Sequence, residues 1–346
     1  MKLITTQGDL AHALRTIAPA ISTSNSHPIL SCCLLAADGA TMTVTGFNLD
    51  LGISVTVPAA VEAPGTVALP HRLLAGLVSR FEDGEVLTLS DGALTACGAS
   101  YGLAAMDAED FPAMPVVEAP GAELSLSDGV RACLPCCSTD ISKAMLSGIH
   151  MAAGYMEATD GHRLMRIPVA LPDGIDLVLP ASTMKLLQDR TVTVAAAAGQ
   201  AVIDAGDGIT IYSRILDGKY PDVAALVPAS FEHTMTLDRH RFARCLERVA
   251  LIAEAHNSVV KLTAVDGYVV ITAEADANNG KERLDYDGDG TGAWAFNVHY
   301  LLDGLKAMRG NEAVLLSANS ATTPVTLQPA DKTGMTYLVM PVQIRE

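Results

Sequence analysis

A threefold internal recurrence restricts the fold of this chain more than any other feature of its sequence. A short apolar run leads into a helical pattern near residues 69, 179 and 296, which gives a period of roughly 110 residues. Each period contains two amphipathic helical patterns and about eight short runs of alternating apolar residues. Because helices and strands do not alternate one by one, the recurrence predicts an α+β fold with antiparallel sheets.

The recurrence also predicts the domain organisation. Proline-containing segments at 115–121 and 228–233 separate the three periods and are typical of linkers. We expect three tandem domains of one type at 1–118, 119–231 and 232–346, each with two helices packed on antiparallel sheets. Of the 346 residues, 49% are hydrophobic and only 4% aromatic, so aliphatic side chains are sufficient to build the cores.

Local signals place the helices and the turns within each period. The first helix of each period is expected at 8–21, at about 127–138 with an interruption at Pro135, and from 237 onward. The second helix is expected after Pro70, after Pro180 and at the N-cap residue Asn297. Turns between strands are expected at the Asp-Gly pairs 38–39, 83–84, 91–92, 160–161 and 266–267.

The basic residues are distributed against the overall charge. A formal net charge of −16 argues against a protein held on nucleic acid by bulk attraction alone. Yet about half of the Lys and Arg residues fall in or beside the six helical patterns, opposite the apolar stripes. A solvated face explains any single helix, whereas six such helices favour a surface that follows a phosphate backbone without reading bases. The residues expected to face DNA are Arg15, Arg72, Arg80, Arg131, Lys185, Arg190, Arg241, Arg244, Arg248, Lys306 and Arg309.

Three polar residues near the middle of the chain form a candidate functional cluster. Asp160, His162 and Arg163 place a carboxylate, an imidazole and a guanidinium within four positions after a turn, as in some acid–base sites. No nucleophile, second paired carboxylate or phosphate-binding loop accompanies them in the sequence pattern. Their absence argues against a catalytic site, and we expect no catalytic residue and no enzymatic activity; the alternative role for the cluster is the rim of a binding pocket.

Two further motifs match metal or redox sites only in part. The segment 285–290 has acids at its first, third and fifth positions and Gly at the sixth, but Phe296 stands where a calcium loop needs Glu. We expect a turn between strands there, with a metal-dependent enzyme as the alternative.

Cys133 and Cys136 have CxxC spacing, but no second pair of ligands for zinc follows. The pattern predicts buried thiols in a helix. We expect neither a metal nor a cofactor.

The sequence carries no sign of export or membrane insertion. Its start has no apolar run typical of a signal peptide, and no stretch of about 18 apolar residues occurs. The seven cysteines are an odd number, which in this context indicates reduced thiols. We expect a cytoplasmic protein.

Six segments together resemble the bacterial replicative sliding clamp, the β subunit of DNA polymerase III. They are His27-Pro28-Ile29-Leu30, Asp110-Phe111-Pro112, Thr159-Asp160-Gly161-His162-Arg163-Leu164, Asp217-Gly218-Lys219-Tyr220-Pro221-Asp222, Phe296-Asn297-Val298-His299-Tyr300-Leu301-Leu302 and Tyr337-Leu338-Val339-Met340-Pro341. The resemblance implies a head-to-tail homodimeric ring whose helices line a hole for duplex DNA. It also implies a non-catalytic processivity factor that tethers replicative and repair polymerases and the clamp loader.

The resemblance further implies a peptide-binding pocket between the second and third domains. Its expected residues are Leu146, Thr159, Gly161, His162, Arg163, Leu164, Pro221, Leu226, Leu338, Met340, Pro341 and Val342. Apolar walls with a few polar groups suit a linear motif with hydrophobic anchors. The expected dimer interface joins Tyr101 and Leu103 of one subunit to Leu251 and Ile252 of the other around a twofold axis.

The chain departs from the family pattern at three places. Ser24 stands where relatives carry a basic loop residue, Ala225 where they carry an arginine, and Ala144-Met145 where they carry an aromatic pair. Ser24 and Ala225 keep open an alternative function, namely a diverged clamp copy that binds protein partners or an inhibitor without being the main replication clamp.

Overall fold

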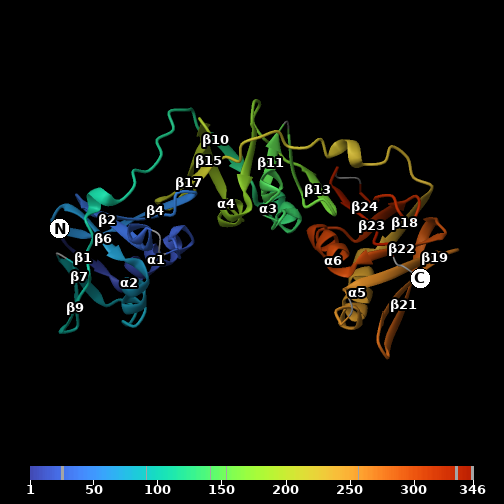
Figure 1. Ribbon diagram of the computed structural model, residues 1–346, viewed down its shortest axis with the longest axis horizontal. Coiled ribbons are helices and arrows are strands. Elements are labelled where there is room, and N and C mark those ends of the chain that lie inside the picture. Colours follow the sequence, from blue (N-terminus) through green and yellow to red (C-terminus); the bar gives the residue numbers. More distant parts are fainter. Residues whose placement is uncertain are drawn as a thin grey trace. The chain divides into compact units, whose positions relative to one another are not determined.

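The computed structural model describes residues 1–24, 27–90, 92–140, 142–152, 154–255, 257–331 and 334–343 (Figure 1). The chain divides into two compact units. The first unit comprises Met1–Ser125 and Arg190–Ile215, and the second comprises Leu126–Asp189 and Leu216–Glu346.

The first unit contains two antiparallel sheets. The five-stranded sheet has the order β5 (Ala60–Ala63), β1 (Lys2–Thr6), β7 (Val86–Ser90), β8 (Ala93–Ala96), β9 (Ala99–Gly102). The eight-stranded sheet has the order β10 (Ala122–Ser125), β15 (Thr191–Ala197), β16 (Gln200–Asp204), β17 (Ile209–Arg214), β4 (Leu51–Pro58), β3 (Thr41–Phe47), β2 (Cys32–Asp38), β6 (Gly65–Pro70). Because β17 pairs with β4, strands of the first and second sequence periods share one sheet.

The second unit is organised on one antiparallel twelve-stranded sheet. Its order is β14 (Asp176–Pro180), β11 (Gly148–Ala152), β12 (Tyr155–Thr159), β13 (Arg163–Pro168), β25 (Thr336–Val339), β24 (Val325–Pro329), β23 (Ala313–Ala318), β18 (His233–Asp238), β21 (Asn278–Asp289), β20 (Tyr268–Ala275), β19 (Val259–Val265), β22 (Gly292–Asn297). The second and third periods meet where β13 pairs with β25, with Leu164 opposite Leu338.

Six α-helices occur in the described residues, two in each sequence period, and the predicted α+β class is confirmed. They are α1 (Gln7–Ile17), α2 (His71–Val78), α3 (Ser127–Cys133), α4 (Ala181–Leu186), α5 (Arg239–Ala253) and α6 (Val298–Ala307). The N-cap predicted at Asn297 is confirmed, since its side chain accepts a hydrogen bond of 2.9 Å from the backbone N–H of His299. No helix within the described ranges is long and apolar enough to cross a membrane.

The longest helix shows how the cores form. Phe242, Leu246 and Val249 of α5 are buried against β20 and β21, as their spacing predicts. Arg241 and Arg244 lie on the exposed side of the same helix. One amphipathic helix therefore supplies both core packing and a basic surface.

Two helices end earlier than their apolar patterns predict. α1 ends at Ile17 instead of continuing to residue 21, and a 3₁₀ turn containing Pro19 follows. α3 ends at Cys133 instead of near residue 138, and a 3₁₀ turn containing Pro135 follows. Proline lacks the backbone N–H that would continue the helix, so its position outweighs the apolar periodicity.

The Asp-Gly pairs have different outcomes. Gly39, Gly161 and Gly267 lie between paired strands with positive φ angles, as predicted. The pair 83–84 instead links α2 to β7, and the pair 91–92 includes Asp91, which lies outside the described residues.

The prediction of a turn at 285–290 is wrong, because this segment is extended and continues β21 up to Asp289. Leu284 and Tyr286 are buried, whereas Asp285 and Asp287 are exposed. The acids therefore alternate with core residues, and the resemblance to a calcium loop is a by-product of strand periodicity.

The contact between α6 and β25 provides a test of packing in the second unit. A Cβ added at Gly304 would lie 2.6 Å from the ring of Tyr337, which is 1% exposed and donates a 2.7 Å hydrogen bond to the Tyr300 carbonyl. We expect Gly304→Ala to lower the free energy of unfolding by about 1–3 kcal/mol, because overpacking exceeds the gain in helix propensity. Urea unfolding followed by the fluorescence of Trp294, the only tryptophan in the sequence, measures the loss. Gly310→Ala is the control, because an added Cβ there meets open space. Equal effects of the two changes would contradict the packing argument.

Candidate functional site

The turn between β12 and β13 is fixed by its own polar side chains. The Thr159 hydroxyl donates to the Arg163 carbonyl at 2.7 Å and accepts from the Gly161 N–H at 3.1 Å. One Asp160 carboxylate oxygen accepts from the backbone N–H groups of His162 at 2.8 Å and Arg163 at 3.0 Å. Gly161 has a φ of 93°, a conformation that suits glycine. Asp160 is thus a structural acceptor in this turn.

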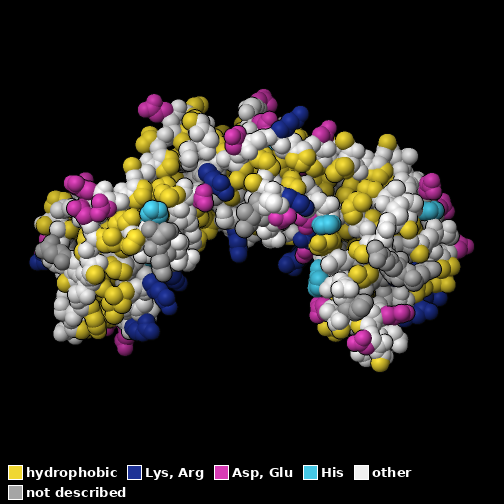
Figure 2. Space-filling view, in the orientation of Figure 1, with side chains coloured by type: hydrophobic (Ala, Val, Ile, Leu, Met, Phe, Trp, Pro, Cys, Tyr) yellow, Lys and Arg dark blue, Asp and Glu magenta, His cyan; other side chains and the backbone are white. Residues whose placement is uncertain are grey.

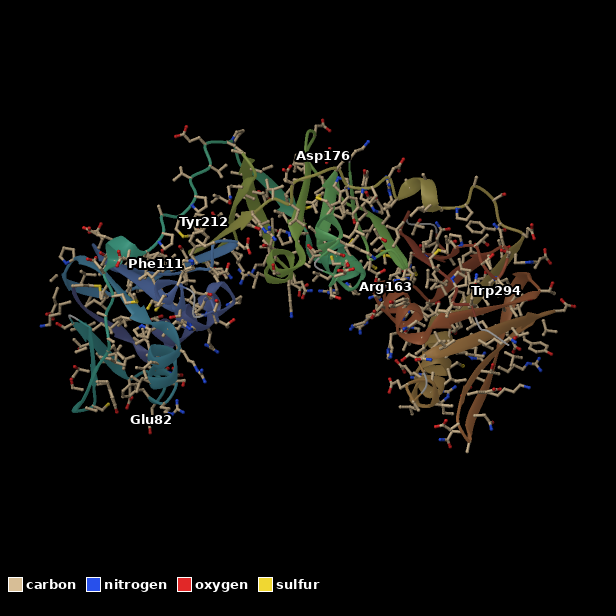
Figure 3. The ribbon with its side chains drawn as sticks, in the orientation of Figure 1. Glu82, Phe111, Arg163, Asp176, Tyr212 and Trp294 are labelled. Carbon is tan, nitrogen blue, oxygen red and sulfur yellow. The ribbon has the colours of Figure 1, made fainter. Side chains whose placement is uncertain are left out.

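Arg163 connects the turn to α6 and to the segment after α3 (Figure 3). Its guanidinium donates to Asp160 at 3.0 Å, to Asp303 of α6 at 2.6 Å and to the Pro135 carbonyl. It also lies 4.3 Å from the centre of the Tyr300 ring. Because its side chain is only 12% exposed and its donors are engaged, Arg163 positions the site.

His162 is the exposed member of the cluster. Its carbonyl accepts a 2.8 Å hydrogen bond from the Met340 N–H, which holds the chain beyond β25 beside the turn. Its imidazole lies 6.5 Å from the Tyr300 ring at an interplanar angle of 22°. His162 therefore carries an exposed polar side chain, and its backbone lies next to Met340.

An apolar cluster lies beside this turn. Its buried members are Leu164, Val178, Leu216, Tyr220, Val223 and Leu338, and the partly buried residues packed against them are Met145, Leu146, Val227 and Met340. The partly buried members make apolar surface available to a ligand, and Met side chains adapt to different shapes. We call these ten residues the apolar cluster.

The structure brings together most, but not all, of the residues expected in the pocket. Leu146, Leu164, Leu338 and Met340 belong to the apolar cluster, and the β12–β13 turn adjoins it. Pro221 and Leu226 are exposed on the segment that supplies Tyr220 and Val223, and Leu226 is 54% exposed.

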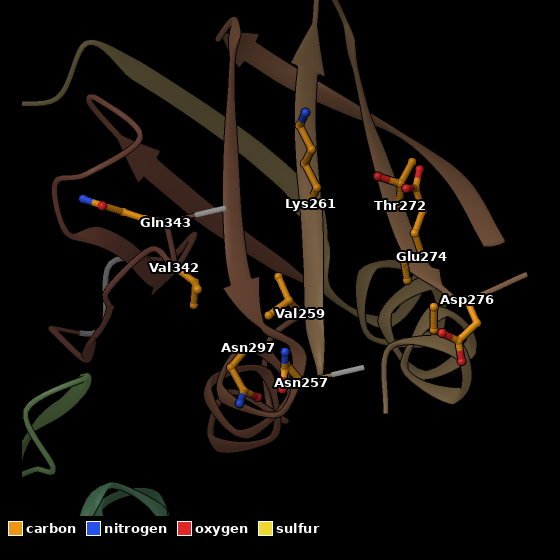
Figure 4. Close-up of a pocket in the computed structure, with 11 residues that line it drawn as sticks. Asn257, Val259, Lys261, Thr272, Glu274, Asp276, Asn297, Val342 and Gln343 are labelled. Carbon is orange, nitrogen blue, oxygen red and sulfur yellow. The ribbon is translucent and has the colours of Figure 1, made fainter. Parts of the chain in front are cut away.

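Val342 lies apart from the apolar cluster. Its N–H donates to the Ala295 carbonyl at 2.7 Å, and it lines a different cavity of about 830 Å³ (Figure 4). The other walls of that cavity include Lys261, Glu274 and Asn297. In the described part of the chain no group of three or more His, Cys, Asp or Glu residues could hold a metal ion.

Val178 and Tyr220 belong to the apolar cluster but were not among the residues predicted for the site. Val178 reads as an ordinary member of an apolar strand, and only the pairing of β14 with β11 brings it beside the cluster. Tyr220 stands within one of the quoted family segments, next to Pro221, so a signal for it was present.

The cysteines of the CxxC motif lie in an environment that does not favour the reactive thiolate form. Cys133 and Cys136 are buried, as predicted, and Cys137 is half-buried. Burial raises the pKa of each thiol, that of Cys137 to about 12. A raised pKa keeps the thiols protonated and unreactive at neutral pH.

Most of the predicted DNA-facing residues are exposed in or next to helices. In the first unit Arg15 and Arg72 are exposed on α1 and α2, where Figure 2 shows Lys and Arg side chains gathered. Arg190 is half-buried and donates to the Ala205 carbonyl at 2.8 Å. The other exposed members are Arg80, Arg131, Lys185, Arg241, Arg244, Arg248, Lys306 and Arg309.

Two of these basic residues are engaged by carboxylates of their own unit. Arg131 contacts Asp189, and Arg248 donates to both oxygens of Glu282 at 2.6 Å and 2.8 Å. Neutralised in this way, Arg131 and Arg248 contribute less to a phosphate-attracting surface than Arg241 or Arg244.

The expected dimer residues differ in accessibility. Tyr101 lies in β9, at an edge of the five-stranded sheet, and is 38% exposed. Leu103 follows that strand and is buried. Leu251 is 76% exposed in the last turn of α5, and Ile252 beside it is half-buried. An unpaired strand edge and a large exposed leucine are both features of association surfaces.

The role given to Arg163 can be tested through stability. We expect Arg163→Ala to lower the free energy of unfolding by about 3 kcal/mol, because it leaves Asp160 and Asp303 without their shared cation. Urea unfolding followed by Trp294 fluorescence measures the loss. Arg283→Ala is the control, since its pair with Asp285 is largely exposed and is expected to contribute below about 1 kcal/mol. A loss below about 1 kcal/mol in Arg163→Ala, as in the control, would refute the positioning role of Arg163.

Comparison with known proteins agrees with this architecture. Residues 1–115 match the family model of the DNA polymerase III beta subunit, N-terminal domain, and residues 224–343 match the model of its C-terminal domain. The beta sliding clamp of Synechococcus elongatus is 33% identical over 376 residues, with 100% of both chains covered. That of Caulobacter vibrioides is 27% identical, covering 99% of this chain and 100% of its own.

Solved structures show the same fold. The DNA polymerase sliding clamp of Bacillus subtilis superposes with a TM-score of 0.91 at 22% identity, over 100% of both chains. That of Caulobacter crescentus gives a TM-score of 0.90 at 25% identity, over 99% of this chain and 100% of its own. Nothing in these comparisons favours a diverged copy. The chain therefore belongs to the beta sliding clamp family, the beta subunits of DNA polymerase III, and its function is that of a DNA sliding clamp.

Proposed function

We propose that two copies of this chain form a ring around duplex DNA and tether polymerases, repair proteins and the clamp loader through the apolar cluster. Each chain contributes three domains, at 1–118, 119–231 and 232–346, and the ring works in the cytoplasm without catalysis. The observation that carries the proposal is the apolar cluster with its fixed polar turn, placed on the sheet of a sliding clamp.

The chemistry of the cluster supports capture of a short peptide. Four members of the cluster are only partly buried, namely Met145, Leu146, Val227 and Met340. Apolar side chains of a partner that cover them remove apolar surface from water, which lowers the free energy of the complex. His162 adds a polar group beside Met340, which suits a backbone or side-chain hydrogen bond at the rim. A solved structure of the Pseudomonas aeruginosa sliding clamp has griselimycin bound, and we expect griselimycin to bind this chain as well.

The charge pattern supports sliding on DNA. The acidic total of −16 opposes tight adhesion, whereas exposed arginines such as Arg241 and Arg244 supply local attraction to phosphates. Contacts to phosphates alone carry no sequence information, so the ring moves along any duplex. The edge strand at Tyr101 and the exposed Leu251 are the surfaces through which we expect two chains to join.

Retention on DNA tests the topological part of the proposal. After loading onto nicked circular DNA, the protein is expected to remain bound through gel filtration, because a closed ring cannot leave a closed circle. Cutting the circle with a restriction enzyme is expected to release it within minutes. Equal retention on circular and linear DNA would refute encirclement.

A substitution in the apolar cluster tests the peptide site. Met340→Glu is expected to weaken binding of griselimycin, and of a peptide with leucine and phenylalanine anchors, by about tenfold or more, because a carboxylate must be desolvated. Fluorescence anisotropy measures the affinity, and native mass spectrometry checks that the dimer is intact. Val265→Glu, a similar change at a 39% exposed position on β19, is the control. Unchanged affinity in Met340→Glu would remove the site assignment.

A further inference from the structure

A row of alternating charges crosses four neighbouring strands beside the apolar cluster. In strand order it consists of Asp176, His150, Glu157 and Arg166, and Figure 3 labels Asp176 on β14. His150 lies 2.9 Å from Glu157 through Nδ1 and 3.0 Å from Asp176 through Nε2. Arg166 donates to the second Glu157 oxygen at 3.1 Å.

The geometry defines the charge of His150. Each of its two nitrogens faces a carboxylate oxygen, and an ionised carboxylate only accepts hydrogen bonds. Both nitrogens can donate only when the ring is an imidazolium. Glu157 is 2% exposed and is the firm partner, whereas the side chain of Asp176 is 81% exposed and is the weaker one.

The same imidazole supports a member of the apolar cluster. The Tyr220 ring stacks on His150 with 4.7 Å between ring centres and 25° between planes. Tyr220 is 7% exposed and packs with Leu164 and Leu338 in the cluster. Val178, another member, stands directly opposite His150 in the pairing of β14 with β11. The charged row and the apolar cluster are therefore in direct contact.

We infer that His150 is a positioning residue of the peptide site: its imidazolium, held between Glu157 and Asp176, fixes the Tyr220 ring as a wall of the apolar cluster. Loss of the proton removes a hydrogen bond to one carboxylate and the charge under the ring, so the wall loosens and partner affinity falls. This inference rests on the proposed peptide-binding function.

The surrounding groups make His150 the pH-sensitive member of the row. Tyr155 lies edge-on at 6.0 Å, and the Arg166 guanidinium covers the Tyr155 ring at 3.7 Å. Burial raises the pKa of Tyr155 and of Tyr220, and it raises the pKa of the nearby Cys133 and Cys137 thiols. Among these side-chain types, only imidazole has an ordinary pKa between pH 5 and 8.

The direction of the pH effect follows from the contacts. Burial alone would lower the pKa of His150, but its hydrogen bonds to Glu157 and Asp176 outweigh burial and raise the pKa above the ordinary 6.5. A raised pKa means that the stabilisation is complete below pH 6.5 and is lost as the pH rises through the folded-state pKa. Partner binding is therefore expected to weaken on the alkaline side.

The test compares binding profiles of the full chain from pH 6 to pH 9, with griselimycin as the probe. The affinity of the wild type is expected to fall about three- to tenfold across this range. His150→Gln is expected to bind griselimycin weakly and with the same affinity at every pH. His162 and the titration of the probe are common to both proteins, so the difference between the profiles belongs to His150. His299→Gln is the matched control, because His299 also faces a carboxylate, Glu254 at 3.8 Å, at an exposed position.

A second variant covers the case in which His150→Gln does not fold. Asp176→Asn removes the negative charge from the exposed acceptor and is expected to move the midpoint of the binding profile to lower pH, a shift that a merely structural role would not produce. The ¹³C NMR shift of the His150 ring should follow the same midpoint. Identical profiles in the wild type and His150→Gln, or an unmoved midpoint in Asp176→Asn, would overturn the inference and leave the peptide site standing. No griselimycin binding at any pH would overturn the peptide site together with it.

Discussion

The pairing of β13 with β25 is the contact on which the candidate site of the second unit depends. It places Leu164 opposite Leu338 and Arg163 opposite Val339, and it brings Met340 beside His162. A strand shifted by one residue would turn its core side chains to the other face of the sheet. The buried leucine pair therefore fixes the register, and the register places Met340 beside the polar turn.

Charged residues serve this arrangement in two different ways. The Asp160–Arg163–Asp303 contacts hold the turn, the strand and α6 together. Side chains of types that are common in catalytic sites therefore have a structural role here. The Asp176–His150–Glu157–Arg166 row pairs opposite charges across neighbouring strands, which satisfies a carboxylate that is nearly inaccessible to water. In both cases residues of opposite charge pair with each other. The exposed part of the apolar cluster stays available to partners.

The sequence was sufficient for the fold class, the two helices of each period, the N-cap at Asn297 and three of the hairpin turns. These features depend on local periodicity and turn chemistry, which a sequence displays directly. The interruption at Pro135 was predicted, whereas the helix end at Pro19 and the extended 285–290 segment were not, because short-range signals for helices, turns and strands overlap there. His150, Val178 and Tyr220 were not predicted for the site, because only the pairing of β14 with β11 and the stacking of Tyr220 on His150 bring them together. The pocket and dimer residues came from family resemblance and the DNA-facing residues from the charge pattern of the helices, and all of them stay predictions.

The order in which the chain is made gives the β13–β25 pairing a further meaning. Arg163 and Leu164 are synthesised well before Leu338 and Met340, so the apolar surface lacks one side while the third sequence period is still being translated. Contacts between such distant segments close late in folding. A nascent chain thus cannot offer a complete peptide surface, and partners that search for it meet only finished subunits.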